Sequence, residues 1–156
     1  FISILYSDLW GDYWGYFTFT SRFLDIGRNQ LAIGDYFARI NIISAFTSIV
    51  IVALCIKTFR KYKSRFIVQY LKLAIICSFI GYLIFAIAYP DATSDTVKAT
   101  YIIQLFHLMV FTASIYLNYL EKINKKIYIS IISFLVIAYI HNFQSYLSHF
   151  PINFYP

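Results

Sequence analysis

The chain has 156 residues, of which 60% are hydrophobic, 21% aromatic and only 13% charged, and its formal net charge is +6. A soluble domain carries about 25% charged residues, so this composition excludes an ordinary soluble domain and predicts an integral membrane protein. The mean hydropathy of +0.67 agrees with that class.

Residues 1–35 are predicted to form an aromatic, extracytoplasmic segment that lies on or dips into the membrane interface. The first residues, FISILYSDLWGDYWGYFTFT, are half apolar, but Asp8 and Asp12 interrupt them. An acidic residue at mid-membrane costs about 2.5–3.5 kcal/mol on insertion scales, which argues against a clean span here. We expect Asp35 to cap the start of the helix that follows.

The remainder, residues 36–156, contains four apolar stretches that alternate with polar turns. Each stretch has about 20 residues, the length that an α-helix needs to cross ~30 Å of hydrocarbon. We therefore predict an all-α, polytopic membrane helical bundle with about four transmembrane helices, at about residues 36–56, 66–88, 100–120 and 127–147. Cys55 and Cys77 would lie at different depths, so we expect no disulfide between them.

Basic residues gather on one side of this predicted topology. The loops at 57–65 and 121–126 fall on the same membrane face and carry a single acid, Glu121, against Lys57, Arg60, Lys61, Lys63, Arg65, Lys122, Lys125 and Lys126. By the positive-inside rule this face is cytoplasmic. The opposite face mixes both signs, with Arg22, Arg28, Arg39 and Lys98 against Asp8, Asp12, Asp25, Asp35, Asp91 and Asp95. The positive charge therefore orients the chain in a membrane, and we expect no nucleic-acid partner.

The stretch SDLWGDYWGYF carries the clearest binding pattern, because Trp10 and Trp14 are four residues apart and flank Asp12. Residues four apart share one face of a helix. Aromatic rings beside a carboxylate suit a sugar, since the rings stack on C–H faces and the carboxylate accepts hydroxyl hydrogen bonds. The alternative is an interfacial aromatic belt, with Gly11 and Gly15 allowing a close helix contact.

Three cations of the outer face, Arg22, Arg28 and Lys98, could clamp a lipid-linked phosphate or pyrophosphate. The alternative is pairing with nearby carboxylates or plain solvation. Two outer carboxylates without an evident third ligand do not make a metal site, so we expect no metal.

His107 and His141 suggest a different class of function. Both would lie ~10 Å below the outer surface, in the third and fourth predicted spans, and facing each other they could ligate a haem from two sides. The alternative is that each histidine hydrogen-bonds a neighbour inside the bundle.

At SDLWGDYWGYF, ARIN and SDTVKATYIIQLFHLM, the sequence resembles the C-terminal membrane portion of bacterial and archaeal GT-C-type glycosyltransferases, which are similar to protein mannosyltransferases. In that family a Trp-Gly-Asp-Tyr-Trp element precedes a helix, and it corresponds here to Trp10–Trp14. A Lys-Ala-Thr/Ser-Tyr stretch leads into a later helix, and it corresponds here to Lys98–Tyr101.

This resemblance implies that the full enzyme moves a sugar from a polyprenyl-phosphate carrier to an extracytoplasmic acceptor, in the plasma membrane of a prokaryote. It implies sugar or acceptor contacts for Trp10, Asp12 and Trp14, and carrier-phosphate contacts for Arg22, Arg28 and Lys98. The family's catalytic base is an acidic residue of an upstream outer loop and does not correspond to Asp8 or Asp12, so we expect this chain alone to be inactive.

The expected partners are the lipid bilayer, the polyprenyl-phosphate-linked sugar and an upstream part of the same protein, without a cofactor. We see no signal peptide at the start of the sequence and expect the chain to be the C-terminal part of a longer protein, with a processed N-terminus as the alternative. Two other functions stay open: a small haem- or quinone-binding membrane anchor that uses His107 and His141, and a structural membrane subunit.

Overall fold

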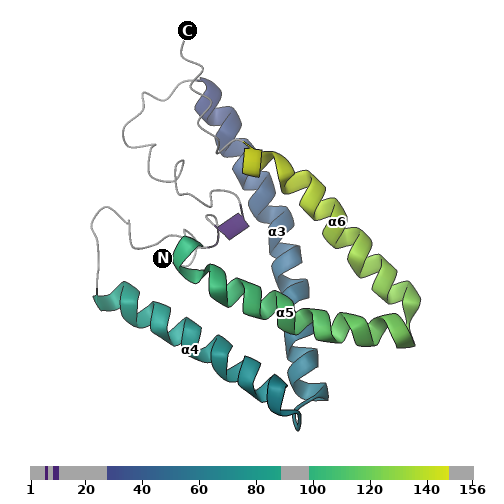
Figure 1. The fold of residues 1–156 in the computed structure, drawn as a ribbon. Coiled ribbons are helices and arrows are strands. Elements are labelled where there is room, and N and C mark those ends of the chain that lie inside the picture. Colours follow the sequence, from purple (N-terminus) through teal and green to yellow (C-terminus); the bar gives the residue numbers. More distant parts are fainter. Residues whose placement is uncertain (1–5, 7–8, 11–27, 89–98, 148–156) are drawn as a thin grey trace.

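The structure is a computed structural model that describes Tyr6, Leu9, Trp10 and residues 28–88 and 99–147. Within the two long ranges, side chains are described for residues 39–88 and 102–143. The long ranges form four helices, namely α3 (Arg28–Lys61), α4 (Phe66–Ala88), α5 (Ala99–Ile123) and α6 (Lys125–Leu147) (Figure 1).

All four helices are long and apolar enough to cross a membrane, over Arg39–Lys61, Phe66–Ala88, Ile102–Ile123 and Lys125–Phe143. Each covers the ~20 residues that a crossing helix needs. The prediction of an all-α fold with four membrane-crossing helices is thus confirmed for the described part of the chain. Residues 1–5, 7–8, 11–27, 89–98 and 148–156 lie outside it, and so does most of the predicted interfacial segment.

The start of α3 differs from the sequence prediction. The helix begins at Arg28, well before the predicted span at residue 36. Asp35 is therefore not a helix cap, as we predicted, but an interior residue of α3. No proline interrupts residues 28–35, and the one glycine there, Gly34, weakens a helix by only about 1 kcal/mol, so the helix continues through it.

The basic stretches are also more helical than predicted. Residues 57–61 belong to α3 and only residues 62–65 form the turn to α4, where the Tyr62 amide still donates to the Thr58 carbonyl over 2.9 Å. Between α5 and α6 only Asn124 is non-helical, and its Oδ1 accepts from the Ile127 amide over 3.1 Å as an N-cap. Lysine and arginine are good helix formers with long side chains that reach water, so a helix need not end where its charges begin.

Helices α3 and α5 are the centre of the arrangement, because each of them contacts the other three described helices. Figure 1 shows α5 crossing α3, while α4 diverges from α3 beyond the turn that joins them. At the crossing, Ile51, Leu54 and Cys55 of α3 pack with Ala113 of α5 into one core cluster. A second cluster joins Tyr82 of α4 to Ile102 and Leu105 of α5.

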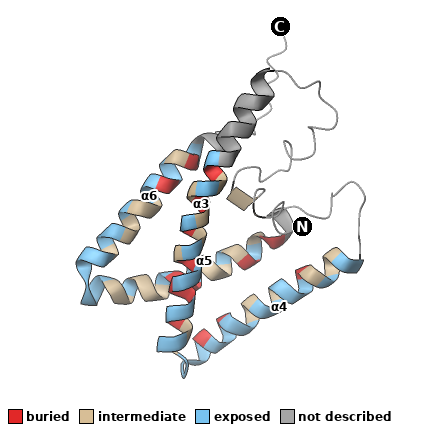
Figure 2. Cartoon of the chain, turned by 180° about the vertical axis from the view of Figure 1, so that it is seen from behind, coloured by how far each residue is buried: buried red, intermediate tan, exposed pale blue. Residues whose placement is uncertain are grey.

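Helix α4 buries little of its surface. Its buried residues are Val68, Leu71 and Tyr82, while large apolar side chains such as Phe66 and Ile87 are 85% and 76% exposed. Figure 2 shows the exposed residues running along the whole helix. In water such a surface would be unfavourable, but hydrocarbon accepts it, so we interpret the exposed side of α4 as facing lipid.

Candidate functional site

One face of α3 carries a regular series of contacts to the rest of the molecule. We call it the α3 seam, and its residues follow one another at alternating steps of three and four: Asn41, Ser44, Ser48, Ile51, Cys55 and Thr58. This spacing keeps all of them on one side of a helix. Ser44, Ile51, Cys55 and Thr58 are buried. Small and weakly polar side chains let helix backbones approach closely in a membrane and can hydrogen-bond across the contact.

In the lower part of the seam, Cys55 and Thr58 form hydrogen bonds with backbone carbonyl groups of α5. The Cys55 thiol donates to the Met109 carbonyl over 2.9 Å. Thr58 Oγ1 lies 2.9 Å from the Thr112 carbonyl oxygen on α5 and 3.0 Å from the Leu54 carbonyl oxygen on its own helix, so its single proton can serve either. Ala113, only 3% exposed, fills the space between the helices. The α3–α5 crossing is therefore tightly packed and hydrogen-bonded.

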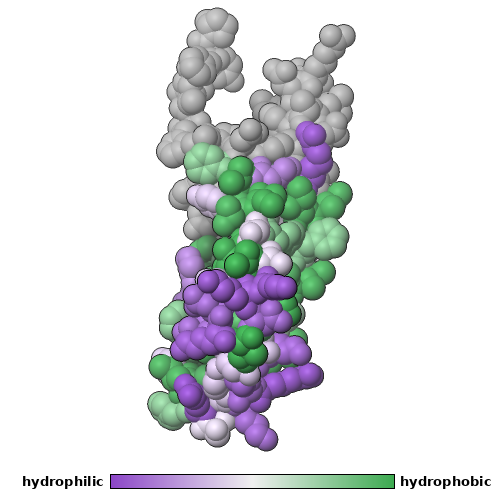
Figure 3. All heavy atoms as spheres, turned by 90° about the vertical axis from the view of Figure 1, so that its right-hand side faces the viewer, coloured by the Kyte–Doolittle hydropathy of each residue, from purple (hydrophilic) through white to green (hydrophobic). Residues whose placement is uncertain are grey.

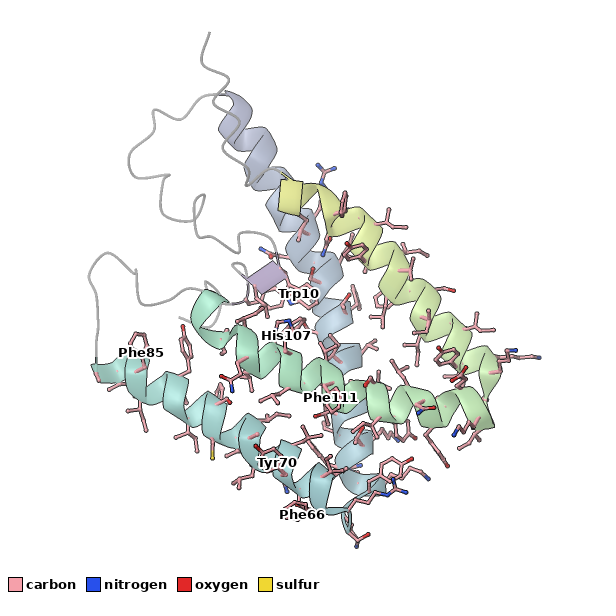
Figure 4. The ribbon with its side chains drawn as sticks, viewed as in Figure 1. Trp10, Phe66, Tyr70, Phe85, His107 and Phe111 are labelled. Atoms are coloured by element: carbon pink, nitrogen blue, oxygen red, sulfur yellow. The ribbon has the colours of Figure 1, made fainter. Side chains whose placement is uncertain are left out.

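The upper part of the seam contacts two aromatic residues, Tyr6 and Trp10. The Tyr6 hydroxyl donates to the Asn41 carbonyl over 2.6 Å, and the Trp10 indole Nε1–H donates to Ser48 Oγ over 2.9 Å. The Trp10 ring also meets the Phe106 ring of α5 edge to face, with 5.3 Å between centroids. Figure 4 shows Trp10 in this position, near His107 of α5. Trp10 thus contacts both α3 and α5.

Helix α6 joins the seam through a buried polar pair. Asn142 Nδ2 donates to Ser44 Oγ over 2.7 Å, and both residues are buried. The neighbouring His141 lies with its Nδ1 3.0 Å from Asn142 Oδ1. Because an amide is costly to place in hydrocarbon without partners, this pair determines which face of α6 turns toward α3.

A cavity lies between α4 and the first turns of α5. It has a volume of about 300 Å³ and is lined by Ser78, Gly81, Tyr82, Phe85, Ile102, Gln104 and Leu105. We call it the α4–α5 pocket. Most of its wall is apolar, with one hydroxyl, one phenol and one amide as polar groups. Gly81 leaves the wall open, because a Cβ built on it would meet nothing within 4 Å.

The pocket belongs to the end of the bundle that is remote from the basic turns. Its α4 residues lie in the C-terminal half of that helix, and its α5 residues lie in the first two turns. The chain turns at 62–65 and at Asn124 are at the opposite ends of the same helices. Mainly apolar walls with a few fixed polar groups are typical of small-molecule sites.

Among the predicted sugar-binding residues, the structure describes only the side chain of Trp10. Its indole N–H donates a hydrogen bond to Ser48. Arg28 is the first residue of α3, but its side chain lies outside the described part, as do Asp12, Trp14, Arg22 and Lys98 altogether. The predicted contacts of these residues with sugar and phosphate therefore stay predictions.

The two histidines of the haem alternative lie on different helices. His107, on α5, is exposed, and its ring is tilted by 58° against that of Phe106 at 6.4 Å. His141, on α6, is partly buried beside Asn142. Among the described residues, no group of three or more His, Cys, Asp or Glu side chains could hold a metal ion.

The sequence analysis missed both the α3 seam and the pocket. The regular spacing of small and hydroxyl side chains along residues 41–58 could have indicated the seam. Ser78 and Gly81 in a long apolar run were a weaker indication of a site on α4.

Comparisons of the chain with known family models, curated proteins and solved structures find no match.

Proposed function

We propose that this chain is the C-terminal membrane part of an integral membrane glycosyltransferase that moves a sugar from a polyprenyl-phosphate-linked donor to an extracytoplasmic acceptor. The α4–α5 pocket is the observation that supports this proposal most directly. An apolar cavity that lies between two membrane-crossing helices suits the isoprenoid chain of such a donor. Ser78, Tyr82 and Gln104 add polar groups near one end of the bundle.

The N-terminal motif and the pocket share helix α5. Trp10, the first residue of the Trp-Gly-Asp-Tyr-Trp stretch, contacts Phe106, and the preceding residue, Leu105, lines the pocket. Lys98, the cation proposed to bind the carrier phosphate, directly precedes α5 in the sequence. Trp10 thus contacts the same first half of α5 that carries the pocket residues Ile102, Gln104 and Leu105, and Lys98 directly precedes this helix in the sequence.

Under this proposal the basic turns face the cytoplasm and the pocket lies toward the extracytoplasmic side. The catalytic acid belongs to another part of the enzyme, and this chain supplies part of the wall that holds the donor. Transfer by this chain alone is therefore not expected, and binding is the activity to measure first.

Photo-crosslinking tests the pocket in the chain itself. A polyprenyl phosphate that carries a diazirine on its isoprenoid chain should label Tyr82, Ile102 or Leu105, as located by mass spectrometry of peptides. Gly81→Leu should abolish the labelling, because its side chain would enter the open part of the cavity. Cys77→Leu is the matched control, since Cys77 is exposed on the same helix and does not line the pocket. Equal labelling of wild type and Gly81→Leu would contradict the proposal.

Transfer assays in the full-length protein test the sugar-binding motif. Asp12→Asn should lower transfer severely, because the carboxylate is lost while the shape is kept. Lys72→Ala should barely change it, since Lys72 is exposed on α4 outside the pocket. Equal transfer by Asp12→Asn and wild type would remove Asp12 from the site.

A Soret band in the purified protein would instead favour the haem-binding anchor and overturn the transferase proposal.

A further inference from the structure

The end of α3 meets the last two turns of α5, although about 60 residues separate them in the sequence. Lys61, at the end of α3, places its Nζ 3.5 Å from the ring centroid of Tyr119, in the last two turns of α5. Tyr62 meets the same Tyr119 ring edge to face, at 6.5 Å between centroids. From this arrangement we propose that the α3–α4 turn and the adjoining last two turns of α5 form a binding site for the phosphodiester headgroup of an anionic phospholipid.

Aromatic rings hold the cationic heads of this site in place. The Lys61 Nζ lies 5.7 Å from the Tyr62 ring centroid, and the Arg65 Cζ lies 4.8 Å from the same centroid. Tyr116 contacts Tyr119, with 5.5 Å between their ring centroids and the rings tilted by 50°. A cation over a ring face is attracted by the ring quadrupole and keeps its N–H donors available to an oxygen anion. Lys61 and Arg65 are therefore pre-positioned around one tyrosine.

The charge around this proposed lipid site is strongly positive. Among the side chains that the structure describes, Glu121 is the single carboxylate, against Lys57, Arg60, Lys61, Lys63, Arg65, Lys122, Lys125 and Lys126 at this end. Figure 3 shows hydrophilic side chains gathered on the lower half of the face that carries the α5–α6 turn, with hydrophobic ones above. Two helices begin and two end here, so their dipoles largely cancel and the side chains determine the potential.

Exposed apolar side chains beside the cations favour a lipid over a soluble phosphate. Phe66, the first residue of α4, is 85% exposed, and Ile123 and Ile127, on either side of Asn124, are 57% and 49% exposed. Tyrosine rings prefer the headgroup level of a membrane, where lipid phosphates lie. A ligand with a phosphate head and acyl tails would contact both the cations and these apolar residues. Clusters of four to eight basic residues next to a membrane helix are typical of anionic-lipid binding.

This site is separate from the α4–α5 pocket and does not depend on the glycosyltransferase proposal. Native mass spectrometry of the chain in zwitterionic detergent tests it, with phosphatidylglycerol, phosphatidylcholine and glycerol 3-phosphate as probes. We expect phosphatidylglycerol to bind at least about tenfold more tightly than phosphatidylcholine. Equal binding of the two lipids would overturn the proposal. Glycerol 3-phosphate as tight as phosphatidylglycerol would show a plain phosphate site and would overturn the lipid assignment.

Substitutions locate the site. Lys61→Ala and Arg65→Ala should each weaken phosphatidylglycerol binding about fivefold, because one surface cation contributes roughly that much. Arg39→Ala is the matched control, since Arg39 is also an exposed cation of α3 but lies at the far end of its span. Tyr119→Leu should weaken binding and Tyr119→Phe should not, because phenylalanine keeps the ring under Lys61.

Circular dichroism and size-exclusion profiles of each variant show whether the fold is kept. The charge-conserving variant Lys61→Arg should bind phosphatidylglycerol as the wild type does. If Arg39→Ala weakened binding as much as Lys61→Ala, the lipid would respond to net charge alone and the assigned site would be wrong.

Discussion

Helix α5 packs closely against α3 but leaves a cavity where it meets α4. Toward α3 it presents Thr112 and Ala113, both buried, and its backbone carbonyls accept from Cys55 and Thr58. Toward α4 it presents Ile102 and Leu105, which reach Tyr82 but leave a cavity of about 300 Å³ beside them. The first contact is closed and hydrogen-bonded, and the second is open.

The difference shows what holds two helices together when lipid is the solvent. Hydrocarbon is as apolar as leucine, so burying leucine against isoleucine gains little in a membrane. Small side chains and hydrogen bonds supply the attraction instead, and the α3 seam has both. The α4–α5 contact is built from larger apolar residues without the same close approach. A cavity can persist there, and a lipid-like ligand can enter it.

The largest loss of stability should come from placing a larger side chain in the closely packed α3–α5 crossing. Ala113→Leu adds three carbon atoms at a position that is only 3% exposed. Overpacking of this kind costs about 1–3 kcal/mol, and here it would also push Thr112 and Met109 away from their partners on α3. The free energy of unfolding in an SDS titration, followed by circular dichroism, measures the loss.

Ala53→Leu is the control for that substitution, because Ala53 is exposed on α3 and its longer side chain would meet lipid. We expect its unfolding free energy to stay within about 0.5 kcal/mol of the wild type. Similar losses for both variants would mean that α3 and α5 do not pack through Ala113.

The second-largest effect should come from removing a buried hydrogen bond between α6 and the α3 seam. The Asn142–Ser44 hydrogen bond joins α6 to the α3 seam over 2.7 Å. A double-mutant cycle with Asn142→Ala and Ser44→Ala should give a coupling energy of about 0.6–1.7 kcal/mol, the range for hydrogen bonds between membrane helices. A cycle that pairs Ser44→Ala with Asn118→Ala, an exposed amide of α5, should give none. Zero coupling in the first cycle would show that this bond does not orient α6.

In the described part of the chain, the number and type of the helices could be predicted from the sequence because each span meets a simple requirement. A run of about 20 apolar residues must hide its backbone polar groups, and only a helix does so by itself in lipid. Helix ends were harder to predict. Lys57, Arg60 and Lys61 look like loop residues by charge, but their side chains reach water from the end of a helix, so charge did not locate the turn.

The contacts between helices could not be predicted from periodicity alone. Ser44, Ser48 and Thr58 stand at regular spacing in the sequence, yet nothing in that spacing says that Asn142, Trp10 and Thr112 are their partners. Trp10 was predicted to bind sugar, which stays a prediction, and its contacts with Ser48 of α3 and Phe106 of α5 were not predicted. The pocket was missed because a cavity depends on where two helices separate, which is a property of the packing.

A third, smaller effect separates hydrogen bonds across the crossing from those within one helix. Thr58→Val removes the hydroxyl that reaches the Thr112 carbonyl and keeps the shape of the side chain. We expect a loss of about 0.6 kcal/mol in unfolding free energy, the average for such bonds in a membrane protein. Thr112→Val is the matched variant, because the Thr112 hydroxyl donates to Leu108 within α5 over 2.7 Å. Its loss should be smaller, and a larger loss would show that the interhelical bond does not stabilise the crossing.

The smallest effect belongs to the open region and completes the comparison. Gly81→Ala adds one methyl group where nothing lies within 4 Å, and alanine is favoured over glycine inside a helix by roughly 0.5–1 kcal/mol. The variant should therefore be as stable as the wild type or slightly more stable in the same SDS titration. Ala113→Gly, the reverse change in the closed region, should lose stability through both the helix and the packing. If Gly81→Ala instead lost more than about 1 kcal/mol, α4 and α5 would be packed as closely as α3 and α5, and a ligand could enter the pocket only by forcing them apart.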